Sequence, residues 1–137
     1  MQARRGELVD VLDGSGLVAL LDGRPVGLVS WSVEKAADAA EVRALAVADE
    51  VHGRGIGRAL LDAAGDALRA AGVRRAWLVT TNDNLAALAL YQKAGWRLSA
   101  LRPGAIDATR RTLKPAISET GQHGIPLRDE LELELQL

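Results

Sequence analysis

The most informative segment of the chain is residues 47–61, Val47-Ala48-Asp49-Glu50-Val51-His52-Gly53-Arg54-Gly55-Ile56-Gly57-Arg58-Ala59-Leu60-Leu61. An apolar run ends at its start, glycines fill its middle, and from Ile56 apolar residues recur every three or four positions, as in an amphipathic helix. A strand, a glycine turn and a helix in succession point several backbone N–H groups at one place, beside the positive end of the helix dipole. Such a place binds phosphate or pyrophosphate. We expect Arg54 and Arg58 to add charge-assisted hydrogen bonds to that anion.

Two common phosphate-binding motifs do not fit this segment. The P-loop requires Gly-Lys-Ser/Thr after its glycines, and that triplet is missing here. The dinucleotide fingerprint requires a third glycine where Arg58 stands, counted from Gly53 and Gly55. The loop therefore belongs to another kind of phosphate site.

Hydrophobic periodicity predicts the elements around the loop. A turn signal at Asp22-Gly23 separates two β-rich runs, which predicts a hairpin. We expect strands at 17–21, 26–33, 41–47, 76–80, 96–101 and 131–137, and helices at 56–71, 85–93 and, within a long loop over 102–126, near 108–113. A polar and alanine-rich break is expected over 34–40. This order predicts an α/β (α+β) fold on one mostly antiparallel sheet, and 137 residues suit a single domain over 1–137.

Composition excludes several classes of function. The formal net charge is −1, which gives no general attraction to nucleic acid or to an anionic membrane. The chain has no cysteine, so disulfides, thiolate metal sites and cysteine nucleophiles are excluded. His52 and His123 lack metal-ligand spacing, and we expect no metal. Without an apolar run long enough for a membrane span or a secretion signal, the expected location is the cytoplasm.

Two blocks of sequence resemble the GCN5-related N-acetyltransferases (GNAT). His52-Gly53-Arg54-Gly55-Ile56-Gly57 resembles their acetyl-CoA pyrophosphate loop, Gln/Arg-x-x-Gly-x-Gly/Ala, with histidine in the first position. Residues 84–96 resemble their Asn-x-x-Ala-x-x-x-Tyr-x-x-x-Gly-Phe block, with Trp96 for the phenylalanine. The blocks stand in the family's order and spacing. The resemblance implies a central mixed, mostly antiparallel sheet flanked by helices.

The resemblance also implies an activity, the transfer of an acetyl group from acetyl-CoA to an amine. Without cysteine, direct attack of the amine is expected rather than an acyl-enzyme. The alternative is a non-catalytic CoA or acyl-CoA-binding module, a sensor or a subunit of an assembly. The acceptor amine is not identified by the sequence.

The family's site residues carry over position by position. Tyr91 would donate a proton to the CoA thiolate, and Glu41 would take one from the amine. The implied cofactor contacts come from the β-strand amides, the glycine loop and the second block: Leu45, Ala46, Val47, His52, Gly53, Arg54, Gly55, Ile56, Gly57, Arg58, Asn84 and Tyr91. Plainer interpretations stay open: a solvated glutamate, a core tyrosine and an asparagine that only caps a helix.

Two further expectations concern the surface. Members of the family usually begin with a strand and one or two helices before the hairpin, and these elements are expected to be missing here. The sheet edge left exposed would suit a partner, and a homodimer is expected. Arg102, Arg110, Arg111 and Lys114 form a basic stretch that we interpret as a solvated face rather than a site for the CoA 3′-phosphate.

Overall fold

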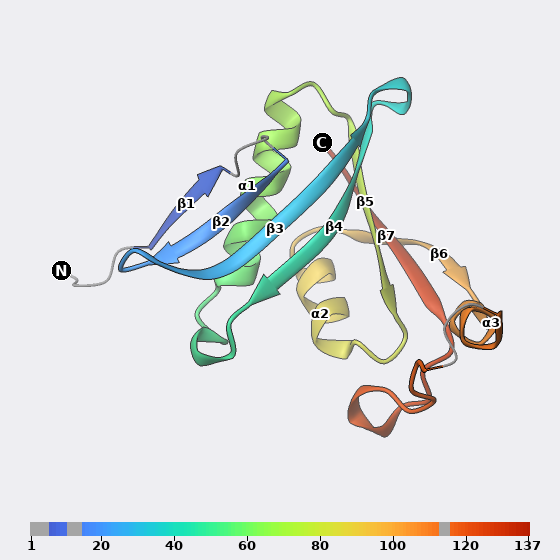
Figure 1. Cartoon of the computed structure of the whole chain (residues 1–137). Helices are drawn as coiled ribbons and strands as arrows, with labels where there is room; N and C mark the ends of the chain where they lie inside the picture. Colours follow the sequence, from blue (N-terminus) through green and yellow to red (C-terminus); the bar gives the residue numbers. More distant parts are fainter. Residues whose placement is uncertain (1–5, 11–14, 113–115) are drawn as a thin grey trace. The chain divides into compact units, whose positions relative to one another are not determined.

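The computed structural model describes residues 6–10, 15–112 and 116–137 (Figure 1). The chain divides into two compact units. The first comprises Met1–Ala76 with Gln136–Leu137, and the second comprises Trp77–Leu135. No helix within the described ranges is long and apolar enough to cross a membrane.

Four antiparallel strands form the sheet of the first unit, in the order β1-β2-β3-β4. They are β1 (Gly6–Asp10), β2 (Gly16–Leu21), β3 (Arg24–Glu34) and β4 (Ala39–Val47). The predicted hairpin is confirmed as β2 and β3. Its two turn residues, Asp22 (φ 52°) and Gly23 (φ 79°), both adopt the left-handed conformation that tight hairpins require.

A strand does precede the hairpin, so the expectation that it is missing was wrong. Residues Gly6–Asp10 pair antiparallel with β2, Leu8 opposite Ala19. Only five residues long, β1 is too short to show a convincing period of two, and the free edge of β2 supplies the backbone partners that make it a strand. In the described residues no helix comes before β2.

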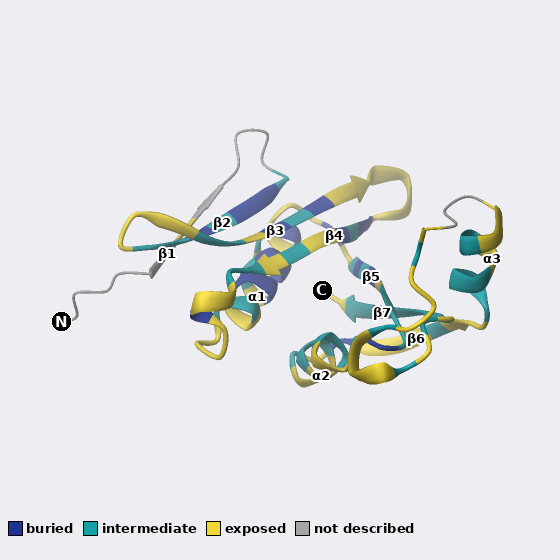
Figure 2. Cartoon of the chain, turned by 60° about the horizontal axis from the view of Figure 1, so that its bottom comes forward, coloured by how far each residue is buried: buried dark blue, intermediate teal, exposed yellow. Residues whose placement is uncertain are grey.

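The core of the first unit lies between the sheet and α1 (Ile56–Ala70). A Cβ on Gly27 would meet side-chain atoms of Ile56 and Leu60, so this face of β3 is turned to the helix. Val29 and Trp31 follow at a spacing of two on the same face and are buried. The helix buries Leu60, Leu61, Ala64 and Leu68, and stretches of β2, β3 and α1 are coloured dark blue, for buried residues, in the ribbon of Figure 2. The helix pattern predicted from Ile56 is thus confirmed.

The break expected over 34–40 is shorter than predicted. Strand β3 continues to Glu34, β4 starts at Ala39, and only the 3-10 turn η1 (Lys35–Ala37) separates them. Ala39 and Ala40 are buried, which small side chains allow although alanine is a weak strand former.

The second unit contains three strands in the order β5-β7-β6. They are β5 (Arg75–Thr81), β6 (Arg97–Arg102) and β7 (Glu130–Gln136), with helix α2 (Leu85–Lys93) between the first two. The strictly alternating end of the chain is a strand, as predicted, and it buries Leu133 completely.

A long insert, residues 103–129, connects β6 to β7. It contains α3 (Ala105–Thr112) and the 3-10 turn η3 (Gln122–Gly124). The short helix expected near 108–113 therefore begins three residues earlier, and the expected Leu113 end lies outside the described residues.

Candidate functional site

The glycine loop follows β4 through the 3-10 turn η2 (Asp49–Val51) and leads directly into α1. Gly53 (φ 82°) and Gly55 (φ 77°) adopt left-handed conformations, and Gly55 is the N-cap of the helix. A Cβ at either glycine would find no atom within 4 Å. The backbone is therefore open to a ligand, and side chains at these positions would strain it.

The start of α1 gathers N–H groups that lack an intrahelical partner. The first i→i−4 backbone hydrogen bond of the helix runs from Ala59 N to Gly55 O, at 3.0 Å. The amides of Ile56, Gly57 and Arg58 precede it in the first turn, where an α-helix offers no carbonyl. These amides and the helix dipole form a place that suits a pyrophosphate group.

The imidazole of His52 is directed at its own chain. Its Nε2 lies 3.0 Å from the carbonyl oxygen of Val47, the last residue of β4, so Nε2–H donates there. Asp49 lies 3.8 Å from the same nitrogen. His52 thus ties the loop to the strand, which accounts for a histidine in this position without a side-chain contact to a ligand.

The two arginines of the loop differ in their partners. Arg58 donates through Nε to Asp62, one turn further along α1, at 2.9 Å. Arg54 is exposed, and within the described residues no carboxylate lies within ion-pair distance of it. It lines a hollow of about 440 Å³ with Arg24 and Glu50. Arg54 is the freer of the two cations.

At the end of β4, backbone N–H groups alternate between pointing to β3 and pointing away from it. Ala48 N donates to Val26 O at 2.8 Å, and antiparallel pairs alternate in direction. The N–H of Ala46, opposite Leu28, is therefore turned to β3 as well. The N–H groups of Leu45 and Val47 point away from β3. Of the three amides expected to bind the acyl group, Ala46 is engaged in the sheet.

Glu41 lies on β4, opposite Ser32 of β3. Its side chain is 23% exposed, and its carboxylate lies 3.6 Å from the guanidinium of Arg43. The side chain is neither fully solvated nor sealed in the core. Both interpretations of this glutamate, base or surface charge, remain consistent with its surroundings.

Asn84 and Tyr91 stand on α2, seven residues and about two turns apart, hence on one side of the helix. Asn84 is the N-cap: its Oδ1 accepts from Ala87 N at 3.3 Å and its Nδ2 donates to Thr80 Oγ1. The Tyr91 ring lies 6.3 Å from that of Trp96, centroid to centroid. Burial raises the pKa of Tyr91, so the phenol stays protonated at neutral pH.

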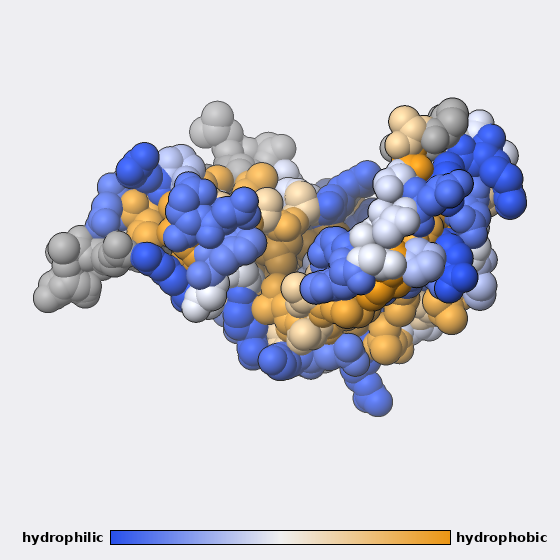
Figure 3. Space-filling view, turned by 90° about the horizontal axis from the view of Figure 1, so that it is seen from below, coloured by the Kyte–Doolittle hydropathy of each residue, from blue (hydrophilic) through white to orange (hydrophobic). Residues whose placement is uncertain are grey.

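Helix α2 carries almost only apolar side chains, yet none of its residues is buried. Leu85 is 45% exposed. Hydrophobic side chains gather over this helix in the view from below (Figure 3). A helix that is apolar all round is normally covered, so this surface suits a ligand with an apolar arm.

Two residues just before α2 hold the insert, and the sequence pattern did not single them out for this role. Asn82 donates to Pro126 O at 2.8 Å, and its Oδ1 accepts from Arg128 N and Asp129 N. Asp83, 4% exposed, accepts from Gln122 N at 2.8 Å and from the Thr81 hydroxyl. We call these contacts the insert brace.

Gly121 completes the insert brace, because a Cβ there would overlap the carboxylate of Asp83. Burial alone raises the pKa of Asp83, but hydrogen bonds from Thr81 and Gln122 and the nearby His123 outweigh it. The net pKa lies below its ordinary value, and the carboxylate is ionised at neutral pH. Sequence patterns around Asn82-Asp83-Asn84 indicate a helix cap, and only Asn84 serves as one.

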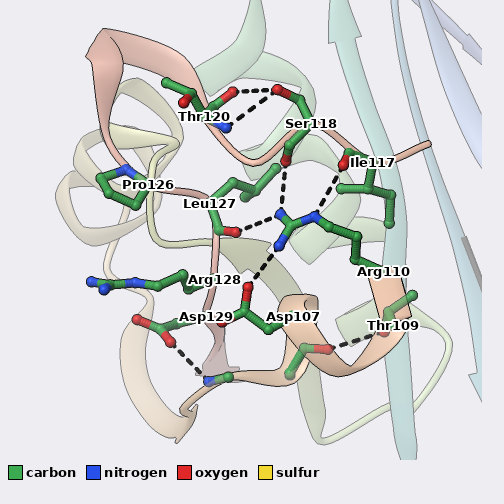
Figure 4. Close-up of polar contacts among 12 residues, drawn as sticks. Asp107, Thr109, Arg110, Ile117, Ser118, Thr120, Pro126, Leu127, Arg128 and Asp129 are labelled. Carbon is green, nitrogen blue, oxygen red and sulfur yellow. Dashed lines mark hydrogen bonds and ion pairs between the residues drawn. The ribbon is translucent and has the colours of Figure 1, made fainter. Parts of the chain in front are cut away.

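The basic stretch Arg102, Arg110 and Arg111 is a solvated face only in part: Arg102 and Arg111 are exposed, and Arg110 is not. Arg102 forms ion pairs with Glu130 and Glu132, at 2.8 and 2.6 Å. The Arg110 side chain, 13% exposed, donates to the carbonyls of Ile117, Ser118 and Leu127 and pairs with Asp107 (Figure 4). Arg111 is exposed, and Lys114 lies outside the described residues. Among the described cations, Arg102 and Arg110 therefore stabilise the fold through their ion pairs and hydrogen bonds.

The structure brings the expected residues into two groups. The first unit contains Glu41, the β4 amides and the whole glycine loop. The second unit contains Asn84 and Tyr91. No cluster of three or more His, Cys, Asp or Glu side chains that could hold a metal occurs in the described ranges.

Comparisons with solved structures define the fold. An acetyltransferase of Bacillus subtilis, solved in complex with CoA, aligns with a TM-score of 0.80 at 21% identity, over 98% of this chain and 99% of that one. A GNAT family acetyltransferase of Elizabethkingia anophelis, solved with acetyl-CoA bound, aligns with a TM-score of 0.77 at 22% identity, over 90% and 77% of the two chains. The fold is that of these acetyltransferases.

Sequence comparison assigns the family. The model of the acetyltransferase (GNAT) family matches residues 3–96. The uncharacterized protein YxbD of Bacillus subtilis is 41% identical over 128 residues, which cover 93% of this chain and 77% of that protein. The chain belongs to the GNAT family of acetyltransferases, and the resemblance noted in its two sequence blocks is confirmed.

Proposed function

We propose that this chain is an N-acetyltransferase that binds acetyl-CoA through residues of the glycine loop and of α2 and passes the acetyl group to an amine acceptor. The observation that carries the proposal is the open loop, with two left-handed glycines and the unpaired first-turn amides of α1. Relatives of this fold are solved with CoA or acetyl-CoA bound. The loop fits the pyrophosphate part of that molecule.

The glycine loop supplies binding. Amides of Ile56, Gly57 and Arg58 donate to the pyrophosphate, and Arg54 adds a cation that has no protein partner among the described residues. His52 keeps the loop in place through Val47. On α2, Asn84 and the apolar surface around it suit the pantetheine arm.

Acetyl-CoA supplies an activated thioester, and the residues supply polarisation and proton transfer. An N–H of Leu45 or Val47, directed away from β3, donates to the carbonyl oxygen as negative charge develops on it. Glu41 takes a proton from the amine nitrogen as the C–N bond forms. Tyr91 gives its phenolic proton to the sulfur as the C–S bond breaks, and solvent returns that proton to the phenol.

Tyr91 suits the role of acid in two respects. Its raised pKa keeps the phenol protonated at neutral pH, so a proton is available when the thiolate leaves. No hydrogen bond engages its hydroxyl among the described residues, which leaves the proton free for transfer. Ring contact with Trp96 holds the side chain without using the hydroxyl.

The test compares Tyr91→Phe with the wild type over a panel of amines, by acetylation rate and by calorimetry with CoA. We expect kcat to fall by about 10²-fold or more, the usual contribution of a general acid, while CoA affinity stays the same. Wild-type turnover in Tyr91→Phe would overturn the proton-donor role. CoA binding without transfer to any amine would favour the non-catalytic module, and no CoA binding would overturn both.

A further inference from the structure

We propose that the acceptor is a primary alkylamine, whose apolar chain lies on the face of β2, β3 and β4 opposite α1 while its nitrogen lies at Glu41. The inference rests on the proposed function and names the chemical class of its acceptor. All the residues concerned belong to the first unit, in which α1 is the only α-helix described. In Figure 1 this helix lies behind the strands. We call the other side of the three strands the open face.

Strand pairing determines which residues lie on the open face. Gly27 and Val29 of β3 are turned to α1, so the alternate residues of that strand lie on the other side. Strand β4 has one extra residue, Arg43, and this bulge keeps the residues before and after it on their faces. Three rows of paired residues therefore cross the open face, an apolar row Val18–Leu28–Ala46, a middle row Gly16–Ser30–Ala44 and a polar row Ser32–Glu41.

The apolar row is the floor of a hollow. This hollow has a volume of about 460 Å³ and is lined only by apolar residues, Val18, Pro25, Val26, Gly27, Leu28, Ala46, Val47 and Ala48. Leu28 is 37% exposed there. Ala44 and Ala46 are exposed as well, although alanine is a weak strand former. Their small side chains leave room above the sheet, so an apolar chain can lie against Leu28.

The polar row suits an amine. Glu41 is 23% exposed and can be reached from solvent. The hydroxyl of Ser32, which stands opposite Glu41, has no hydrogen-bond partner among the described residues. Arg43 lies 3.6 Å from the Glu41 carboxylate and is itself mostly exposed, so this ion pair contributes little and an ammonium group can compete with it. Amines are cations at neutral pH, and the carboxylate attracts them.

The distance between the two rows indicates the length of the acceptor. Leu28 and Ser32 are four residues apart on one strand, which places the polar row about 13 Å from the apolar row. The chains of octylamine and decylamine come close to this span. Those of ethylamine and butylamine end before they reach Leu28. A long-chain amine therefore uses both rows, and a short one uses only the polar row.

An opposing interpretation is an acceptor with several amino groups. Such a molecule binds through several carboxylates, and the open face has a second one in Glu34, opposite Ala39 at the end of β3. A polyamine at Glu34 and Glu41 would leave the hollow around Leu28 empty. The alkylamine accounts for the carboxylate and for the exposed apolar row together.

Acetylation rates over a series of amines test the proposal. Ethylamine, butylamine, hexylamine, octylamine and decylamine are compared below their micellar concentrations, with spermidine as the polyamine. We expect kcat/KM to rise roughly twofold for each added methylene, because a chain on an open surface is only partly removed from water. Equal kcat/KM along the series, or a preference for spermidine over decylamine, would overturn this acceptor class and leave the proposed function standing.

A variant of the apolar row tests where the chain lies. Leu28→Ser should lower the ratio of kcat/KM for decylamine to that for ethylamine by about tenfold. Because this is a ratio within one protein, a loss of folded enzyme cancels. Val33→Ser is the matched control, since Val33 is 43% exposed on the same strand but on the side turned to α1, and it should keep the wild-type ratio. An unchanged ratio in Leu28→Ser would overturn the proposal.

Binding measured without turnover separates this inference from the proposed function. In calorimetry with the CoA-saturated protein, decylamine should bind more tightly than butylamine to the wild type and to Val33→Ser, and this preference should be lost in Leu28→Ser. Tight decylamine binding without any acetylation would support the surface and contradict the proposed function. The absence of a preference in the wild type, or a dimer that Leu28→Ser dissociates, would overturn the inference, the dimer because a second copy would then cover the open face.

Discussion

The glycine loop and the insert brace each collect hydrogen-bonding groups at the start of a helix, and they use them differently. At the loop, the first amides of α1 and the side chain of Arg54 have no protein partner within the described residues. At the brace, both ends of the Asn82 amide and the Asp83 carboxylate are engaged by the chain itself. Groups left open suit a ligand, and groups fully engaged fix a backbone.

The strongest prediction separates the loop from an ordinary tight turn. Gly55→Val forces a β-branched residue into a left-handed conformation (φ 77°), a strain on the order of 1–3 kcal/mol. If the loop escapes the strain by changing shape, the first-turn amides lose their arrangement, and CoA affinity should fall roughly 100-fold, about 2.7 kcal/mol. Calorimetric titration with CoA measures the loss.

Gly23→Val is the matched control for this prediction. Gly23 has φ 79°, and a Cβ there, as at Gly55, would find no atom within 4 Å, but it lies in the β2–β3 turn. We expect a similar cost in the free energy of unfolding and unchanged CoA affinity. A comparable loss of affinity in both variants would mean that the loop contributes only stability.

The next prediction tests the insert brace as a unit. Gly121→Ala should lower the free energy of unfolding by about 2 kcal/mol, because its Cβ would overlap the Asp83 carboxylate. Asp83→Ala removes that carboxylate and leaves Gln122 N without its acceptor, at a cost of about 1–3 kcal/mol. In the double variant only the Cβ of residue 83, 2.8 Å from the new methyl group, still crowds it, so Gly121→Ala should cost less than it does in the wild type. If urea unfolding shows that the free-energy losses of the two single variants simply add in the double variant, a direct contact between residues 83 and 121 is contradicted.

The third prediction is a pH dependence of stability. The folded-state pKa of Asp83 is lowered, so its ionised form stabilises the fold above the ordinary aspartate pKa. This contribution should be lost as the pH falls through the folded-state value. Between roughly pH 5 and more acidic solution, the wild type should therefore lose more unfolding free energy than Asp83→Asn does. Parallel curves for the two proteins would show that Asp83 is not the group responsible.

The smallest expected effect is a difference in CoA affinity between variants of the two loop arginines. Arg54→Gln should weaken CoA binding by about 1 kcal/mol at low salt, and Arg58→Gln by less, because Asp62 already engages the Arg58 side chain. Added salt should reduce the difference in CoA affinity between the two variants, since salt screens exposed charges. Equal losses, or no salt dependence, would argue against a phosphate contact of Arg54.

The sequence predicted the helices and strands where local pattern decides them. The period from Ile56, the asparagine cap at Asn84 and the alternating end of the chain are local signals, and α1, α2 and β7 confirm them. Strand β1 escaped because its partner, β2, supplies what five residues cannot show alone. The catalytic roles of Glu41 and Tyr91 stay predictions.

Contacts between distant residues could not be predicted in this way. The insert brace joins Asp83 to Gln122 across 39 residues, and no periodicity in either segment indicates the other. In the sequence Arg102 and Arg110 look like solvated cations. A carboxylate partner of the first and a carbonyl partner of the second lie 28 and 17 residues further along the chain, and they come close only when the insert folds back. The charged residues can be read from the sequence, but their ion-pair and hydrogen-bond partners are known only from the folded structure.

The Arg110 side chain determines how the insert opens. Its guanidinium is held by three carbonyls from both ends of the segment 117–127 and by Asp107 within α3. The helix therefore cannot unwind around Arg110 without breaking the hydrogen bonds to that segment. Conversely, the segment cannot move away without leaving the guanidinium and its three carbonyl acceptors without their hydrogen bonds. In hydrogen exchange, the amides of α3 and of this segment should behave as one cooperative unit, with a shared opening free energy that a single side chain sets.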